Sequence, residues 1–96
     1  MKYIVEIKHE AREEVAESFK YYESVQRGLG LKFLDCVEIT LTSISKHPEL
    51  FAKKHQNFRI ALIKPFPYLV IFEVNKSSVI VYQIINAKKH PSKRYK

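Results

Sequence analysis

Apolar residues in the first quarter of the chain follow two different periods. Residues 3–7 are rich in β-branched side chains and roughly alternate with polar ones, which predicts a strand that begins almost at the first residue. From about Glu10 the apolar positions recur at helical spacing, and glutamates in the first turn suit the positive end of the helix dipole. The helical stripe consists of Ala11, Val15, Phe19 and Tyr22.

Both glycines of the chain follow this helix. Gly28 and Gly30 tolerate the left-handed backbone that commonly closes a helix, so the chain is expected to reverse direction there. A second helical stripe then runs to His47, which precedes Pro48 and is therefore pushed out of the helical region. Its apolar members are Leu34, Val37, Leu41 and Ile44. The pattern predicts two long antiparallel helices.

The second half of the chain changes to strand patterns. Residues 58–63, 68–74 and 79–85 are rich in Val, Ile, Tyr and Phe, and short turn-like segments separate them. These features predict one antiparallel sheet of three strands. With no internal repeat or linker, residues 1–96 are expected to form a single α+β domain: an N-terminal strand, a helical hairpin and the three-stranded sheet.

Charge divides the chain into two parts of opposite sign. The formal net charge is +7, yet residues 1–45 carry six Lys/Arg against eight Asp/Glu, and residues 46–96 carry eleven against two. The cationic surface is therefore expected in the C-terminal half, with residues 87–96 as an exposed basic tail. Such a field attracts a polyanion, either nucleic acid or an acidic protein segment.

Cysteine and histidine usage limits the available chemistry. Cys36 is the only cysteine, which excludes an internal disulfide and fits a reducing cytosol. The histidines show no metal-ligand spacing, so neither a metal nor another cofactor is expected; they are His9, His47, His55 and His90. No apolar run resembles a signal peptide or approaches the ~20 residues of a membrane span, which predicts a soluble cytoplasmic protein.

Short motifs occur in a fixed order along nearly the whole chain. They are Tyr21-Tyr22-Glu23, Gly28-Leu29-Gly30, Phe33-Leu34, Ile44, Pro48-Glu49-Leu50-Phe51, Arg59, Phe66-Pro67-Tyr68, and the ending Asn86-Ala87-Lys88-Lys89-His90-Pro91 with Tyr95. In this order and spacing they resemble the RelE/ParE toxin superfamily, and within it the ParE-like toxins of plasmid stabilisation systems. The resemblance implies the RelE/ParE fold and the toxin role in a type II toxin–antitoxin pair.

The resemblance also implies where catalytic groups of the RNA-cleaving RelE branch would stand. Those members cut mRNA on the ribosome without a metal, which requires cations around the phosphate together with a proton acceptor and donor. They place two basic residues at alternate positions of the strand that corresponds to residues 58–63, and an arginine on the following strand. They also end in an arginine and a tyrosine six positions apart.

This sequence carries about half of that set. Arg59 is followed two positions on by Ala61, and the apolar Leu69 stands where the arginine of the next strand is expected. The C-terminal spacing is kept by Lys89 and Tyr95, although lysine lacks the bidentate fork of arginine. Arg59, Lys89 and Tyr95 are thus the candidates for catalysis, with an ion pair, a solvated tail and packing on the sheet as their respective structural alternatives.

Three functions follow from the resemblance, in order of preference. The first is inhibition of DNA gyrase, which ParE-like members hold in its cleaved-DNA state without catalysing a reaction. The second is a ribosome-dependent mRNA endonuclease, and the third an inactive relative that only binds. The cognate antitoxin is expected to be an acidic, amphipathic segment that docks on the helices and adds to the sheet. The predicted contacts with target or antitoxin are Arg59, Lys64, Tyr68, Lys88, Lys89, Lys93 and Arg94.

Overall fold

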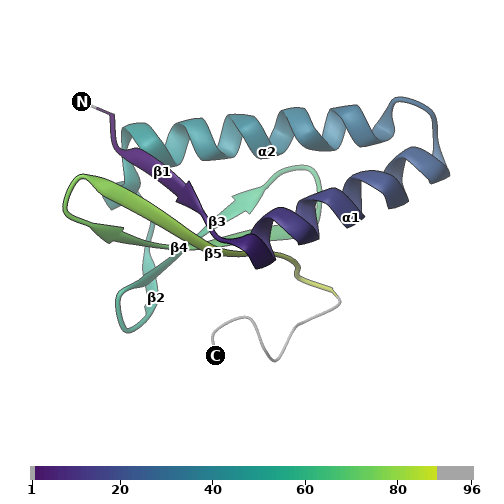
Figure 1. Cartoon of the computed structure of the whole chain (residues 1–96). Coiled ribbons are helices and arrows are strands. Elements are labelled where there is room, and N and C mark those ends of the chain that lie inside the picture. Colours follow the sequence, from purple (N-terminus) through teal and green to yellow (C-terminus); the bar gives the residue numbers. More distant parts are fainter. Residues whose placement is uncertain (1, 89–96) are drawn as a thin grey trace.

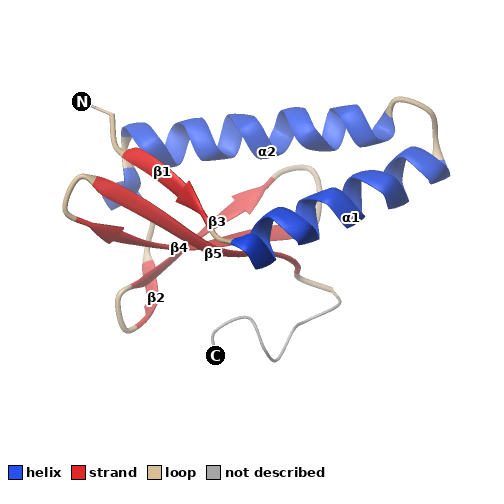
Figure 2. Cartoon of the chain, viewed as in Figure 1, coloured by secondary structure: helices blue, strands red, loops and turns tan. Residues whose placement is uncertain are grey.

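Two long helices lie against one face of a twisted sheet in the computed structural model, which describes residues 2–88 (Figures 1 and 2). The elements in chain order are β1 (Ile4–Ile7), α1 (His9–Val25), α2 (Leu29–Lys46), a 3-10 helix η1 (Pro48–Leu50), β2 (Lys53–His55), β3 (Phe58–Ile63), β4 (Tyr68–Asn75) and β5 (Ser78–Asn86). The predicted α+β class and the helical hairpin are confirmed.

The predicted three-stranded sheet is wrong, because the sheet within residues 2–88 has five strands in the order β1-β5-β4-β3-β2. The three central strands do form the expected antiparallel meander. The N-terminal strand β1 joins them by pairing in parallel with β5, so the first and last strands of the described residues lie side by side. Sequence patterns contain no signal for a pairing between segments that are more than 70 residues apart.

The strand β2 was also absent from the prediction. It has only three residues, Lys53, Lys54 and His55, and all three are exposed and polar. It pairs with the first residues of β3 and forms the outer edge of the sheet. A short edge strand with lysines discourages pairing with a further strand, which explains why it lacks the apolar pattern of an inner strand.

The two glycines of the hairpin have different roles. Gly28 caps α2 with a φ of 89°, the left-handed conformation that the sequence predicts for this turn. Gly30 lies inside α2, where a Cβ would stand 2.8 Å from the Cδ1 atom and from the backbone oxygen of Phe19. Gly30 therefore allows the two helices to approach closely.

The Glu23 carboxylate joins the end of α1 to the start of α2. One of its oxygens accepts a 2.9 Å hydrogen bond from the Gly28 N–H, and the other accepts one of 2.9 Å from the Gly30 N–H. The first N–H groups of a helix have no partner within that helix, and an anion there also interacts favourably with the helix dipole. Glu23 thus performs the task of an N-terminal cap from the preceding helix.

Replacing Glu23 by alanine is expected to destabilise the domain by about 1–2 kcal/mol, the usual effect of losing a good N-terminal cap. The matched control is Glu17→Ala, an exposed position on the same helix, which should change stability by less than about 0.5 kcal/mol. Urea denaturation followed by circular dichroism measures both. Equal destabilisation by the two variants would show that Glu23 does not act as a cap.

Aromatic rings form the centre of the layer between the helices and the sheet. Phe33 of α2 is fully buried, and its ring centroid lies 4.9 Å from that of Tyr68 and 5.2 Å from that of Phe66. Tyr22 of α1 completes the cluster at 4.9 Å from Phe66 and 5.3 Å from Phe33. Burial, with Tyr68 close by, raises the pKa of the Tyr22 hydroxyl to about 12, so this phenol stays protonated.

A buried hydrogen bond links the first helix to β4. The hydroxyl groups of Ser18 and Tyr68 are 2.6 Å apart, and these residues are 5% and 4% exposed. Each hydroxyl therefore relies on the other in place of water.

Tyr68→Phe is expected to destabilise the protein by about 1–2 kcal/mol, because it leaves the buried Ser18 hydroxyl without its partner. Tyr82→Phe is the control, since it removes a hydrogen bond to Glu73 from a half-buried site where water can replace it. Thermal melting of both variants tests this expectation, and a smaller shift for Tyr68→Phe than for Tyr82→Phe would contradict it.

Candidate functional site

The two faces of the sheet carry different side chains, and the strand register assigns each residue to one of them. Arg59, Ala61 and Ile63 of β3 stand opposite Phe72, Val70 and Tyr68 of β4, and all of these except Arg59 belong to the core under the helices. We call this the helix-covered face. Since side chains alternate along a strand, Leu69 points to the opposite side, here called the second face.

The positions expected for an RNA-cleaving set are therefore not on one face. Arg59 and Ala61 belong to the helix-covered face, where Ala61 is 2% exposed, whereas Leu69 is on the second face. A basic residue in place of Ala61 would be buried under α2. Packing therefore accounts for both departures from the RNA-cleaving pattern: Ala61 fits the core under the helices, and Leu69 packs in the apolar cluster of the second face.

Arg59 supports the connection between α2 and β2. Its Nη1 atom donates a 2.6 Å hydrogen bond to the Phe51 carbonyl oxygen and a longer one of 3.4 Å to that of Glu49. These carbonyls belong to the segment around η1, and one guanidinium nitrogen of Arg59 contacts both of them. These contacts favour a structural role for Arg59 over a catalytic one. Its partners are main-chain carbonyl groups, whereas the structural alternative named from the sequence was an ion pair.

The second face is apolar at its centre. Leu69, Ile71 and Ile85 form a small buried cluster there, with Phe58 and Ile60 packed against it. These buried side chains carry no charge, so they supply no partner for a phosphate of RNA.

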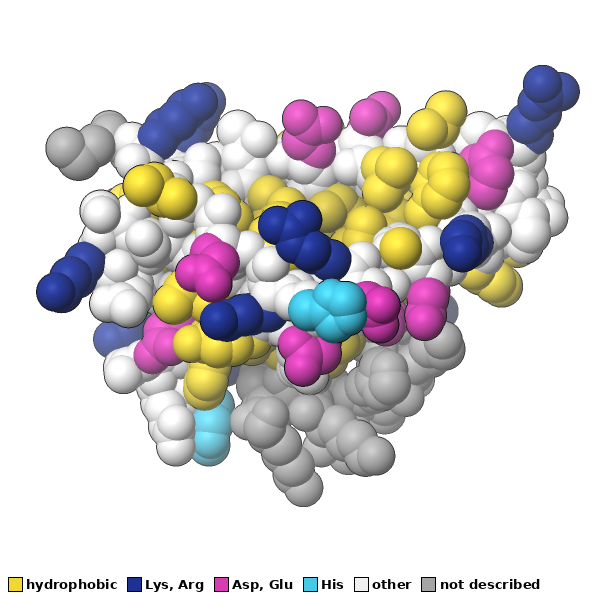
Figure 3. Space-filling view, in the orientation of Figure 1, with side chains coloured by type: hydrophobic (Ala, Val, Ile, Leu, Met, Phe, Trp, Pro, Cys, Tyr) yellow, Lys and Arg dark blue, Asp and Glu magenta, His cyan; other side chains and the backbone are white. Residues whose placement is uncertain are grey.

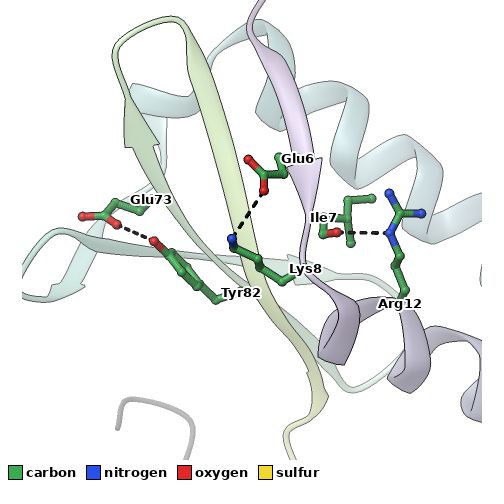
Figure 4. A network of polar contacts seen from close by, with 6 residues as sticks. All are labelled: Glu6, Ile7, Lys8, Arg12, Glu73 and Tyr82. Carbon is green, nitrogen blue, oxygen red and sulfur yellow. Dashed lines mark hydrogen bonds and ion pairs between the residues drawn. The ribbon is translucent and has the colours of Figure 1, made fainter.

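Polar side chains of β1, β4 and β5 and the residue that follows β1 lie near one another, among them the carboxylates of Glu6 and Glu73 and the ammonium group of Lys8 (Figure 4). The Tyr82 hydroxyl donates a 3.0 Å hydrogen bond to Glu73, and Glu6 forms a 3.3 Å ion pair with Lys8. Partial burial, together with Glu73 and the more distant Glu6, raises the pKa of Tyr82 above its ordinary value. A protonated tyrosine beside two carboxylates is a poor base for cleaving RNA.

The predicted binding residues that the structure describes do not form one site. Lys64 follows β3 and Lys88 follows β5; both are exposed, and the Ala87 N–H to Pro67 carbonyl bond of 2.8 Å joins these ends of the sheet. Arg59 lies five residues before Lys64 along the strand direction, roughly 16 Å away at the usual rise. Tyr68 is in the core. Lys89, Lys93, Arg94 and Tyr95 lie outside the described residues.

An apolar groove runs between the edge strand β1 and helix α2. Its volume is about 320 Å³, and its apolar lining comes from Val5 and Ile7 of β1 and from Leu34, Val37 and Leu41 of α2. The space-filling view shows hydrophobic side chains gathered along this side of α2 (Figure 3). The sequence predicted that the antitoxin docks on the helices, but it did not show that β1 forms the second wall of this groove.

Residues 2–88 contain no cluster of three or more His, Cys, Asp or Glu side chains that could hold a metal ion. Cys36 is a free, half-buried thiol. None of the helices in this part of the chain is both long and apolar enough to cross a membrane.

Comparison with known proteins agrees with the sequence resemblance. Residues 5–91 match the family model described as the ParE toxin of the type II toxin–antitoxin system parDE. The fold is similar to a chain in a structure titled "Chromosomal ParDE TA system from P. aeruginosa", with a TM-score of 0.78 and 11% sequence identity. This match covers 88% of the present chain and 96% of the other. A search of the curated proteins gave no significant match.

Proposed function

The chain belongs to the ParE toxin family of type II toxin–antitoxin systems, and on this basis we propose that it inhibits DNA gyrase and is neutralised by a cognate antitoxin. The choice of gyrase over mRNA as the target rests on the side chains of the second face of the sheet. Within residues 2–88, the centre of this face is the apolar cluster around Leu69, and Lys8 beside it is paired with the Glu6 carboxylate, so the cations that an RNA-cleaving site needs around the phosphate are not gathered there.

Energetics favour a binding toxin over an endonuclease. Removing one donor that stabilises a transition state typically lowers a rate by ~100-fold or more, and here two of the expected basic positions are Ala61 and Leu69. Arg59 is further engaged by the Phe51 carbonyl. A toxin that acts by stabilising a complex of its target needs a surface of complementary shape and charge. It does not need a set of catalytic basic residues.

The gyrase proposal is tested by incubating the purified protein with gyrase and supercoiled plasmid. The expected result is linear DNA covalently held by gyrase and released by protease and detergent, with a loss of supercoiling activity. Unchanged supercoiling without any cleavage complex would overturn the proposal. In cells, the same proposal predicts arrested replication with DNA damage, whereas cut transcripts and collapsed translation would instead indicate the mRNA endonuclease.

The β1–α2 groove is the proposed docking site of the antitoxin. It offers an apolar trough to one face of an amphipathic segment, and β1 is an edge strand of the sheet, which suits the addition of a further strand. Acidic residues of the segment are expected to contact the cationic second half of the chain, because the one charged residue of the groove lining is Glu38. Expression of the chain alone should stop growth, and co-expression of the antitoxin from the neighbouring gene should restore it. Harmless expression at confirmed levels would count against a toxin and for the inactive relative.

A further inference from the structure

A second hollow lies at the end of the molecule away from the helical hairpin turn. Its volume is about 380 Å³, and it is lined by the start of the chain, the end of α2 and the turn between β4 and β5. Each of these segments contributes a lysine, namely Lys2, Lys46 and Lys76. Figure 3 shows dark blue basic side chains at this end of the molecule. We call this hollow the lysine pocket.

Main-chain hydrogen bonds hold the three lysine-bearing segments together. The Tyr3 N–H donates a 2.7 Å bond to the carbonyl oxygen of Ser45, which precedes Lys46. The Ile4 N–H donates a 3.0 Å bond to the carbonyl oxygen of Ser77, which follows Lys76. The lysines therefore start from fixed backbone positions around one hollow, although they are far apart in the sequence.

The charge of the lysine pocket is not neutralised within residues 2–88. Glu49 is the one acidic residue of the lining, and the ion pairs described in this part of the chain join Lys8 to Glu6 and His9 to Glu13. Repulsion between like charges destabilises a folded protein, and a bound anion would offset this repulsion. Lys76 carries a further free-energy cost, because its φ of 59° lies in the left-handed region that favours Gly or Asn.

We propose that the lysine pocket binds the phosphodiester backbone of a nucleic acid. Lysine ammonium groups bind phosphate oxygens as point charges, and the hydroxyl groups of Tyr3 and Ser77 supply further donors. The Tyr3 ring beside the amines offers a flat surface to a sugar or a base, a combination that is frequent in nucleic-acid sites. An acidic peptide fits less well, since its apolar side chains would find no apolar lining other than this ring. The proposal does not depend on gyrase as the target.

The test measures binding of the full chain to a fluorescein-labelled 20-base-pair duplex by anisotropy over a series of salt concentrations. The pocket variant is Lys46→Gln with Lys76→Asn, in which asparagine tolerates the left-handed backbone. The matched control is Lys20→Gln with Lys32→Gln, which removes the same charge from exposed helix positions outside the pocket. Circular dichroism melting confirms that each variant is folded.

The pocket variant is expected to bind the duplex roughly tenfold more weakly, with a salt slope smaller by about 2, because two phosphate contacts are lost. The control should keep the slope of the unsubstituted protein. Equal losses in both variants would mean that only net charge matters and would overturn the proposal. So would a pocket variant that loses affinity for a polyglutamate peptide while its binding to DNA is unchanged, an outcome that assigns the pocket to an acidic protein.

Discussion

Phe33→Ala is expected to lower the free energy of unfolding by about 3–5 kcal/mol, the usual range for removing a fully buried phenylalanine. Phe33 has no exposed surface, and it contacts rings from α1, from the β3–β4 connection and from β4. The neighbouring rings are large and mutually packed, so they cannot collapse into the space that the side chain leaves. Since small domains are stable by about 5–15 kcal/mol, this loss would bring the protein close to unfolding.

Urea denaturation of Phe33→Ala and of Phe58→Ala separates this effect from a general cost of losing a ring. Phe58 is half-buried on the second face, where it meets Tyr82 at 5.4 Å, and it should cost less than half as much. Similar midpoints for the two variants would contradict the central role of the Phe33 cluster. Toxicity in cells should follow the same order, because only folded protein can act on a target.

Local patterns predict this fold well wherever one face of an element is buried. Each of the two predicted helical stripes reaches the core, where Ala11 of the first and Ile44 of the second are fully buried, and β3 has the predicted bounds Phe58–Ile63. The failures concern β1 and β2. The partner of β1 is distant in the sequence, and β2 is too short and too polar to have a period.

One motif of the resemblance receives a physical explanation from the structure. Glu23 and the two glycines Gly28 and Gly30 are separate in the sequence, but the carboxylate binds both glycine N–H groups. The spacing of these three residues thus encodes a hairpin cap. Sequence alone gives their order but does not show this contact.

The candidate surfaces are harder to predict than the fold, because the side of the sheet depends on register. Arg59 matches a basic position of the family pattern, yet it points toward the helix-covered face and binds the Phe51 carbonyl. The lysine pocket shows a related difficulty. Lys2, Lys46 and Lys76 have no spacing in common, and only the pairing of β1 with β5 and its bond to the end of α2 bring them together.

The groove variant Leu41→Ser is expected to weaken antitoxin binding by roughly 10- to 100-fold. Leu41 is half-buried at the margin of the core and lines the β1–α2 groove, so a docked apolar residue loses its contact surface when Leu41 is replaced. Circular dichroism melting confirms that the variant is folded at the temperature of the binding measurement. Burial of a leucine contributes about 1.5–3 kcal/mol, and each 1.4 kcal/mol corresponds to about a tenfold change in affinity. Isothermal titration with the purified antitoxin measures the change.

Leu31→Ser provides the control for this prediction, since it is the same substitution on the same helix at a leucine that is 59% exposed and outside the groove. Its affinity for the antitoxin should stay within about twofold of the unsubstituted protein, because a side chain that stays in water contributes little to binding. If Leu31→Ser weakens binding and Leu41→Ser does not, the antitoxin docks on the outer side of α2 and the groove assignment is wrong. Growth inhibition by Leu41→Ser should persist when the antitoxin is co-expressed, because its effect is on neutralisation and not on the toxic surface.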